Sequence, residues 1–203
     1  IVISVGGDNY SMDYDFPEYF LDVNDIIKSQ NKKLVIWGAS IGPFPKDHNF
    51  ELVRENLRSV DLITARESYT VDYLKNELSI TDNVRLVADP AFLLEGDSVE
   101  IDEIIPDQHQ GNVLGFNISP ILERCFKKDD GGKILEKVAK FLNRMIEEKS
   151  FFILLIPHVT KKGHWNNDFK FMEKIFNMID SKDMVVNVPS IYNARQMKYI
   201  ISK

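Results

Sequence analysis

The sequence predicts an α/β fold in two halves, each built on a mainly parallel sheet. Short apolar runs alternate with longer segments whose apolar residues recur at helical spacing. The alternation stops over residues 96–110, which are rich in acidic and polar residues, and then starts again. Because strands separated by helices form parallel sheets with right-handed crossovers, we expect a domain over residues 1–95, a linker over 96–110 and a second domain over 111–203.

Composition and charge narrow the classes of function. Of the 203 residues, 44% are hydrophobic and 28% charged, as is usual for a soluble globular protein. The net charge of −6 argues against a broad nucleic-acid-binding surface but permits a local basic pocket for a small anion. No apolar run approaches the ~20 residues of a membrane span, and the single cysteine, Cys125, fits a reducing compartment. We expect a cytoplasmic protein without a membrane span. A place of work at the inner face of the membrane also fits this expectation.

The first half opens with an apparent buried strand, Ile1 to Val5, that runs into Gly6-Gly7-Asp8-Asn9. Paired glycines permit a tight turn whose exposed amides suit a phosphate or a carboxylate, although such turns are more often structural. Since this strand begins at the first residue, we expect the chain to start within a fold. A helix is expected from Pro17, because the apolar residues after it recur at helical spacing.

The next strand, Leu34 to Trp37, is an apolar run of the kind that is buried on both faces of a sheet. It ends in the small residues of Gly38 to Pro43, which include Ser40 and Gly42 and would let a backbone approach a ligand closely. In open α/β sheets, ligands bind at this carboxyl end of the strands. A plain strand-to-helix turn explains this stretch equally well.

Arg66 follows another predicted strand, Leu62 to Ala65, and precedes a helix for which Ser68 suits the N-cap position. A guanidinium beside a helix amino terminus favours the binding of an anion. The alternative is that Arg66 pairs with Glu67 or with another neighbouring acid on the surface.

Two further elements complete the first half. A helix is expected over residues 50–60, and a strand over residues 84–88 that leads to Asp89-Pro90. Proline biases the residue before it toward an extended or turn conformation. Asp89 therefore either caps a turn or faces the ligand.

The second half repeats the pattern. Strands are expected over 113–118, 151–156 and 184–188, and helices over 134–146, over 169–179 and from 192 to the end of the chain. Asn117 lies near the end of the first strand, Pro157-His158 follows the second, and Asn167-Asp168 precedes a helix. Histidine exchanges protons near neutral pH, so His158 is the best-placed titratable residue; its alternative is a histidine hydrogen-bonded in a loop. Two such halves predict a ligand cleft between them.

Five short motifs, in this order, resemble the polysaccharide pyruvyl transferases. They are Gly6-Gly7-Asp8-Asn9, Gly38 to Phe44, Ala65-Arg66-Glu67-Ser68, Asp89-Pro90-Ala91-Phe92, and Ile156-Pro157-His158 followed by Asn167-Asp168. The resemblance covers nearly the whole chain and implies two Rossmann-like domains similar to the GT-B type. The implied activity is transfer of a pyruvyl group from phosphoenolpyruvate to sugar hydroxyls, which forms a pyruvate ketal on a cell-surface polysaccharide or its lipid-linked precursor. A bacterial origin is implied as well.

The sequence departs from the family pattern at two places. Asp8 stands where the family's opening loop usually has a third glycine. The Arg-x-His element that family members carry after the last helix, as part of the donor site, has no match in this chain. We therefore expect a chain truncated at both ends, and activity of these 203 residues alone is in doubt.

The implied reaction assigns roles to the candidate residues. Phosphoenolpyruvate carries a phosphate and a carboxylate, so its site should contain guanidinium groups and oriented amides. Ketal formation also needs an acid that protonates the enol carbon and a base that accepts the hydroxyl proton. We expect His158 and Asp8 to be catalytic, with Asp8 in contact with the acceptor sugar. The expected donor-binding residues are Gly6, Gly7, Ser40, Gly42, Arg66 and Ser68, and the expected acceptor-binding or cleft-lining residues are Asn9, Asp89, Asn117, Asn167 and Asp168.

No cofactor is expected besides phosphoenolpyruvate as the donor substrate, and no metal, because no group of residues has metal-ligand spacing. Two other functions fit the same architecture. A nucleotide-sugar glycosyltransferase would hold a nucleotide in the same cleft, and the absence of a Gly-x-Gly-x-x-Gly fingerprint with a downstream acid weakens an NAD-binding interpretation. A non-catalytic binding domain is favoured by the missing Arg-x-His element.

Overall fold

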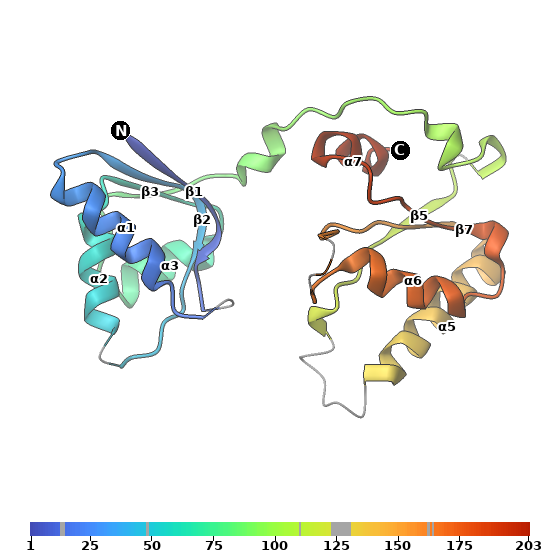
Figure 1. Ribbon diagram of the computed structural model, residues 1–203, viewed down its shortest axis with the longest axis horizontal. Coiled ribbons are helices and arrows are strands. Elements are labelled where there is room, and N and C mark those ends of the chain that lie inside the picture. Colours follow the sequence, from blue (N-terminus) through green and yellow to red (C-terminus); the bar gives the residue numbers. More distant parts are fainter. Residues whose placement is uncertain (13–14, 48, 110, 123–130, 162, 164) are drawn as a thin grey trace. The chain divides into compact units, whose positions relative to one another are not determined.

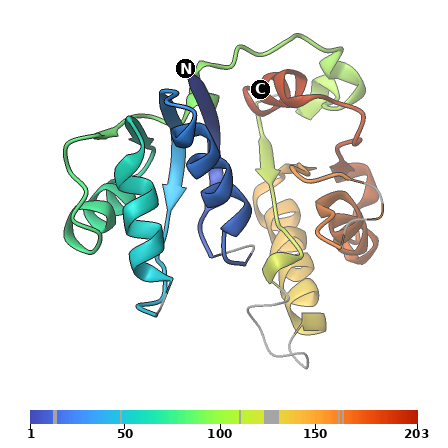
Figure 2. The same ribbon diagram turned by 60° about the vertical axis from the view of Figure 1, so that its left-hand side comes forward.

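The computed structural model describes residues 1–12, 15–47, 49–109, 111–122, 131–161, 163 and 165–203. These residues form two compact units, Ile1–Leu94 and Glu95–Lys203, and each unit contains one parallel sheet with helices packed on it (Figure 1). Figure 2 shows the same elements from a second direction. The predicted α/β class with parallel sheets is confirmed. Cys125 lies outside the described residues.

The first unit is a four-stranded sheet in which neighbouring strands run parallel, in the order β1-β2-β3-β4. A helix follows each of the first three strands. The elements are β1 (Val2–Tyr10), α1 (Glu18–Ser29), β2 (Leu34–Ile41), α2 (Phe50–Ser59), β3 (Leu62–Ala65), α3 (Ser68–Asn76) and β4 (Val84–Leu86). A short 3₁₀ turn, Pro90–Leu93, follows β4.

One apolar core joins this sheet to all three helices. Leu34 and Ile36 of β2 are fully buried against Leu57 of α2 and Leu74 of α3. Side chains alternate along a strand, so the residues between them point to the opposite face. Trp37 is exposed on that face, and the prediction of a strand buried on both faces is wrong at this position.

Strand β1 differs from its prediction in length and in burial. It continues through the two glycines to Tyr10, and Ile3 and Val5 are exposed because β1 is the edge strand of the four-stranded sheet and presents these side chains away from the helices. The expected Gly6-Gly7 turn is therefore absent, because both residues lie in the strand. Strand β2 likewise continues past Gly38 to Ile41.

A buried chain of polar side chains ties the end of β1 to two helices. The Tyr10 hydroxyl donates to Asn24 Oδ1 at 3.0 Å, and Asn24 Nδ2 donates to Asn56 Oδ1 at 2.9 Å. Asn56 Nδ2 donates to Leu21 O and to Asp25 Oδ1. Buried polar groups are costly unless they are paired, so this chain fixes α1 and α2 against the end of β1.

The second unit is a three-stranded parallel sheet in the order β5-β6-β7. Its elements are β5 (Val113–Phe116), α5 (Gly131–Lys149), β6 (Phe152–Leu155), α6 (Asp168–Met178), β7 (Val185–Asn187) and α7 (Ala194–Ile201), with 3₁₀ turns at Ile101–Glu103, Asp107–His109 and Lys182–Met184. The last helix begins at Ala194, where Asn193 forms a capping box with Gln196.

Strand β6 is buried on both faces. Ile153 and Leu155 pack with residues of α5 and α6, whereas Phe152 and Leu154 pack with Ile104 and with residues of α7. Of the segment 96–110, expected as a linker, the described residues 96–109 thus belong to the second unit, and their apolar side chains cover one face of its sheet. Among the described residues, no helix is both long and apolar enough to cross a membrane.

Candidate functional site

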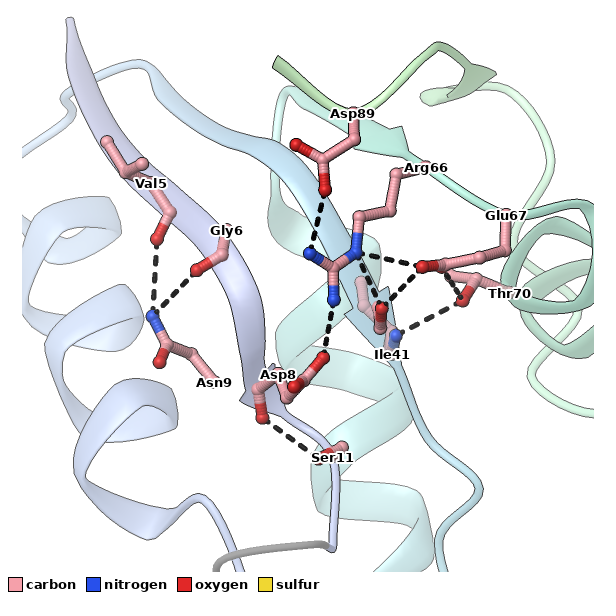
Figure 3. A network of polar contacts seen from close by, with 11 residues as sticks. Val5, Gly6, Asp8, Asn9, Ser11, Ile41, Arg66, Glu67, Thr70 and Asp89 are labelled. Atoms are coloured by element: carbon pink, nitrogen blue, oxygen red, sulfur yellow. Dashed lines mark hydrogen bonds and ion pairs between the residues drawn. The ribbon is translucent and has the colours of Figure 1, made fainter. Parts of the chain in front are cut away.

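Four polar residues of the first unit meet at the carboxyl edge of its sheet. Asp8 lies near the end of β1, Ser40 near the end of β2, Arg66 directly after β3, and Asp89 shortly after β4. Parallel strands end at the same edge, so residues that are far apart in the sequence come together there (Figure 3). This edge is the usual ligand-binding edge of an open α/β sheet.

Arg66 is the centre of this group. Its Nη2 contacts Asp8 Oδ1 at 2.6 Å, and its Nη1 contacts Asp89 Oδ2 at 3.0 Å (Figure 3). Its Nε lies 2.8 Å from Glu67 Oε1 and 2.9 Å from Ser40 Oγ. We call these five residues the Arg66 cluster. All three guanidinium nitrogens therefore have protein partners.

Both oxygens of the Glu67 carboxylate and both oxygens of the Asp89 carboxylate accept hydrogen bonds. Ser40 Oγ donates to Glu67 Oε1, and Thr70 Oγ1 donates to Glu67 Oε2 at 3.2 Å. Asp89 Oδ1 accepts the Ala91 amide at 2.8 Å and so caps the following 3₁₀ turn. Each of these two carboxylates uses both of its oxygens within the protein.

Asp8 is the exception in the Arg66 cluster. Its Oδ1 accepts from Arg66, whereas Oδ2 receives no hydrogen bond from any residue that the structure describes. The side chain is 40% exposed. Its backbone carbonyl accepts from the Ser11 amide and hydroxyl, which fixes the chain just after it. Asp8 thus presents an oriented, partly exposed carboxylate whose second oxygen has no hydrogen-bond donor among the described residues.

Electrostatics distinguish this cluster from a simple anion site. Three carboxylates surround one guanidinium, so the formal charge of the group is −2. Burial by itself would lower the pKa of Arg66, but the hydrogen bond that Arg66 donates to Asp89 and the charges of Asp8 and Glu67 outweigh it and raise the pKa. The Ala91 amide and the Arg66 guanidinium lower the pKa of Asp89. Both shifts favour the charged forms of Arg66 and Asp89.

The structure matches the surface-pairing alternative for Arg66 that the sequence left open. The arginine pairs with Glu67, and also with Asp8 and Asp89. An anion that approached Arg66 directly would meet three negative charges. The expected donor-binding role of Arg66 stays a prediction, since its guanidinium is already paired with three carboxylates in this arrangement.

Several expected donor-binding residues have backbone roles in the structure. A Cβ at Gly6 would lie 2.2 Å from the Gly38 carbonyl oxygen, so glycine is required where β1 and β2 approach. Gly42 has a φ of 74°, and a Cβ there would lie 2.3 Å from the Tyr73 ring. Gly7 has a φ of 86° and sits where the register of β1 shifts. Ser68 is the first residue of α3, and Glu67 occupies the N-cap position, so the expected N-cap role of Ser68 is wrong.

Asn9 turns back along its own strand. Its Nδ2 donates to the carbonyls of Val5 and Gly6, each at 3.2 Å (Figure 3). This contact steadies the end of β1 on the side of Asp8 that faces away from Arg66. The side chain also lines a pocket next to Asp8.

In the second unit, four expected residues gather after β5 and β6. Asp168 is buried, and its Oδ2 accepts the amides of His158 and Val159 at 3.1 and 2.9 Å. Asn117 Nδ2 donates to Ile156 O, and Asn167 Oδ1 accepts the Lys170 amide and caps α6. His158 is exposed at this edge.

Asp168 and Asn167 therefore orient the backbone around His158. The second oxygen of Asp168, Oδ1, is buried and receives no hydrogen bond from the described residues. His48 and His164 lie outside the described residues, and His109 stacks on Phe152 at 4.7 Å. No three His, Cys, Asp or Glu side chains of the described ranges are arranged to hold a metal ion.

Sequence reasoning gave Thr70 no role in the site. Thr70 lies three residues after Glu67, a spacing that brings two side chains to one end of a helix. Its hydroxyl accepts from the Ile41 amide and donates to Glu67, which links β2 to the Arg66 cluster. The Glu67-x-x-Thr70 spacing is the local signal that could have indicated this contact.

Comparison with known proteins adds one match. A family model described as polysaccharide pyruvyl transferase matches residues 1–203, the whole chain. No curated protein matches the chain significantly.

Proposed function

Since the chain belongs to the polysaccharide pyruvyl transferase family, we propose that it acts in the transfer of a pyruvyl group from phosphoenolpyruvate to sugar hydroxyls. The product is a pyruvate ketal on a cell-surface polysaccharide or on its lipid-linked precursor. The family match over the whole chain supports this proposal, as do the two α/β units. A GT-B-like pairing of these units and a cytoplasmic site of reaction, where phosphoenolpyruvate is formed, belong to the same proposal.

The chemistry defines what the residues must do. Two sugar oxygens form bonds to C2 of phosphoenolpyruvate, and the bond from C2 to the phosphate oxygen breaks. One proton is added to C3, which becomes the methyl group, and the proton of the second hydroxyl leaves with the phosphate. A base near the sugar and an acid near C3 would each lower the barrier.

The observation that carries the proposal is the second carboxylate oxygen of Asp8, which has no hydrogen-bond donor among the described residues. Asp8 Oδ1 is fixed by Arg66, so Oδ2 has a defined direction at the carboxyl edge of the sheet. A carboxylate that is oriented in this way can accept a hydrogen bond from a sugar hydroxyl and then its proton. We assign Asp8 this role in the acceptor site.

The charge of the Arg66 cluster determines which substrate it faces. With a formal charge of −2, the cluster favours a neutral hydroxyl over the phosphate and carboxylate of phosphoenolpyruvate. Arg66 is therefore a positioning residue for Asp8 rather than a direct contact of the donor. Gly6, Gly7, Gly42 and Ser68 remain candidate donor-binding residues, whereas Ser40 belongs to the Arg66 cluster.

His158 is the proposed source of the proton for C3. It follows β6 at the carboxyl edge of the second sheet, and Asp168 binds its backbone amide. Histidine is the side chain best suited to proton exchange near neutral pH. Asp168 positions this segment, and Asn117 and Asn167 border it.

The experiment uses the protein at its natural length, with phosphoenolpyruvate and a panel of neutral methyl hexosides that carry free diols. Phosphate release is measured together with the new ketal methyl signal by proton NMR. We expect equal amounts of phosphate and ketal with at least one hexoside, and neither product with its fully O-methylated analogue. Absence of both products across the panel, with no calorimetric binding of phosphoenolpyruvate, would overturn the proposal.

A further inference from the structure

A pocket of about 270 Å³ opens beside Asp8 in the first unit. Its lining includes Asp8 and Asn9 from the end of β1, Asp15 and Phe16 from the following segment, and Tyr19 and Phe20 from the first turn of α1. The volume is near the lower end of the range for small-molecule sites and suits a group of one ring.

Aromatic side chains form one part of this lining. Tyr19 is 72% exposed, and its ring packs edge-on against Phe20 with centroids 5.4 Å apart. An aromatic face carries a negative quadrupole, so it attracts the weakly positive C–H bonds of an apolar ring face. An exposed tyrosine at the margin of a pocket is thus suited to stacking against a sugar ring.

Carboxylates form the other part. Asp8 and Asp15 both line the pocket, and none of the lining residues that the structure describes is basic. The oxygens of these side chains accept hydrogen bonds from hydroxyl groups, as the Asn9 carboxamide oxygen also can. A carboxylate on a ligand inside the pocket would be repelled by both acids. The lining therefore combines hydrogen-bond acceptors for hydroxyls with discrimination against anions.

The walls of the pocket are anchored to the core. Phe20 packs against the apolar core and lies 5.7 Å from the Tyr10 ring, and Tyr10 belongs to the buried polar chain with Asn24 and Asn56. Asp8 is fixed by Arg66 on the other side. A site whose walls are held before binding loses less entropy when its ligand binds.

We propose that this pocket is the subsite for the acceptor sugar and that it selects uncharged sugar rings over uronic acids. The Asp8 oxygen faces the reacting hydroxyl, Tyr19 stacks on the ring, and Asp15 excludes an anionic substituent. The assignment rests on the proposed function, because it takes the acceptor to be a sugar, and it extends that function by naming the charge class of the sugar and the residues that select it.

The first test measures binding of methyl β-D-glucopyranoside in the absence of phosphoenolpyruvate, by saturation-transfer NMR on the whole chain. Tyr19→Ala should weaken binding about 5-fold, the effect of one lost aromatic contact. Ile26→Ala is the matched control, because Ile26 is an exposed apolar residue of the same helix that does not line the pocket. Its affinity should equal that of the unmodified chain. Equal binding by Tyr19→Ala, or no binding to the unmodified chain, would overturn the assignment.

The second test compares the same glucoside with methyl β-D-glucuronide, which differs by a carboxylate. The unmodified chain should bind the glucuronide about 10-fold more weakly, because two acids line the pocket. Asp15→Asn should narrow this difference to about 3-fold. Asn suits the position, since Asp15 has a φ of 79° and asparagine tolerates this conformation. Equal affinity for the two sugars in the unmodified chain would refute the proposed selectivity.

These outcomes separate the subsite from the proposed function. Sugar binding that depends on Tyr19 without any release of phosphate from phosphoenolpyruvate would support the subsite and contradict pyruvyl transfer. Pyruvyl transfer with the same acceptor KM in the Tyr19→Ala variant as in the unmodified chain would support the proposed function and contradict the subsite.

Discussion

At the scale of single residues, Arg66 connects four strands of one sheet. It holds acids from the ends of β1 and β4, the acid that follows it in the sequence, and Ser40 of β2. The cluster contains one cation and three carboxylates, so the same guanidinium offsets the negative charge of all three. Its removal would leave three negative charges close together at a site where the protein has no other cation in contact with them among the described residues.

Arg66→Ala should therefore lower the free energy of unfolding at pH 7 by about 2 kcal/mol. The loss should shrink near pH 4, because protonation of the carboxylates relieves their repulsion. Urea denaturation at the two pH values measures both effects. The matched control is Arg144→Ala, which removes an exposed helical pair with Glu148 and should leave stability nearly unchanged. Equal losses in the two variants would show that the Arg66 cluster is an ordinary surface group.

The sequence located Arg66 at a strand end but could not identify its partners. Asp8 lies 58 residues before Arg66, and Asp89 lies 23 residues after it, so no local pattern relates them. Their meeting depends on the order and register of four strands. The Glu67 contact was foreseeable, since the two residues are adjacent and pairing was the stated alternative.

At the scale of elements, Asp61 connects α1, β2 and β3 at the edge of the first unit's sheet where the strands begin. It lies just before β3 and accepts hydrogen bonds from Lys28 at the end of α1, from Lys33 before β2 and from the Leu34 amide. These three donors hold the pKa of Asp61 far below its ordinary value, with Lys28 the largest cause. Asp61 thus stays charged in the folded protein at a pH where an unfolded chain would be protonated.

The lowered pKa of Asp61 predicts that this residue contributes to a loss of folding stability in acid. Below the ordinary pKa of about 4, the unfolded chain binds a proton at Asp61 that the folded chain does not, so falling pH favours unfolding. The stabilisation is fully present above about pH 5 and is lost progressively below about pH 4. Asp61→Asn should be less stable than the unmodified chain at pH 7 and should approach it at pH 3, as measured by urea denaturation.

Asp72→Asn serves as the control for this pH series, because Asp72 is an exposed acid on α3. Its stability should follow that of the unmodified chain throughout. A constant difference between Asp61→Asn and the unmodified chain from pH 7 to pH 3 would contradict the linkage.

The polar chain of Tyr10, Asn24 and Asn56 makes a second prediction for the elements. Asn24→Ala removes a buried side chain, takes away the Asn24 contact of Asn56 Oδ1 and leaves the Tyr10 hydroxyl with Ser4 Oγ alone of its two partners. The variant should lose about 2–3 kcal/mol of unfolding free energy in urea denaturation. Asp22→Ala, an exposed change on the same helix, should have little effect. A loss in Asn24→Ala no larger than in this control would exclude a structural role for the chain.

Most strands and helices were predictable because their apolar spacing is a local property. The end of β1 was not, since Gly6 and Gly7 suggest a turn when they are considered alone. In the structure, Gly6 serves the close approach of the Gly38 carbonyl on a strand 32 positions later, which no local pattern reveals. Glycine in a strand marks such an approach as well as it marks a turn.

At the scale of the molecule, each unit has its own core and its own polar edge. The core of the first unit joins one face of a four-stranded sheet to α1, α2 and α3, and the second unit has a core on each face of β6. The Arg66 cluster lies in the first unit and the His158 segment in the second. The chain belongs to the polysaccharide pyruvyl transferase family, and each edge has its own role in the transfer that we propose.

The most direct test of this account is ketal formation by Asp8→Asn, measured by phosphate release and by the ketal methyl signal with the protein at its natural length. Asparagine keeps the shape of the side chain and removes the base, so we expect turnover to fall at least about 100-fold. Asp22→Asn should retain full activity, because Asp22 lies outside the Arg66 cluster and the pocket. Unchanged turnover in Asp8→Asn would contradict the assignment of the acceptor site to Asp8.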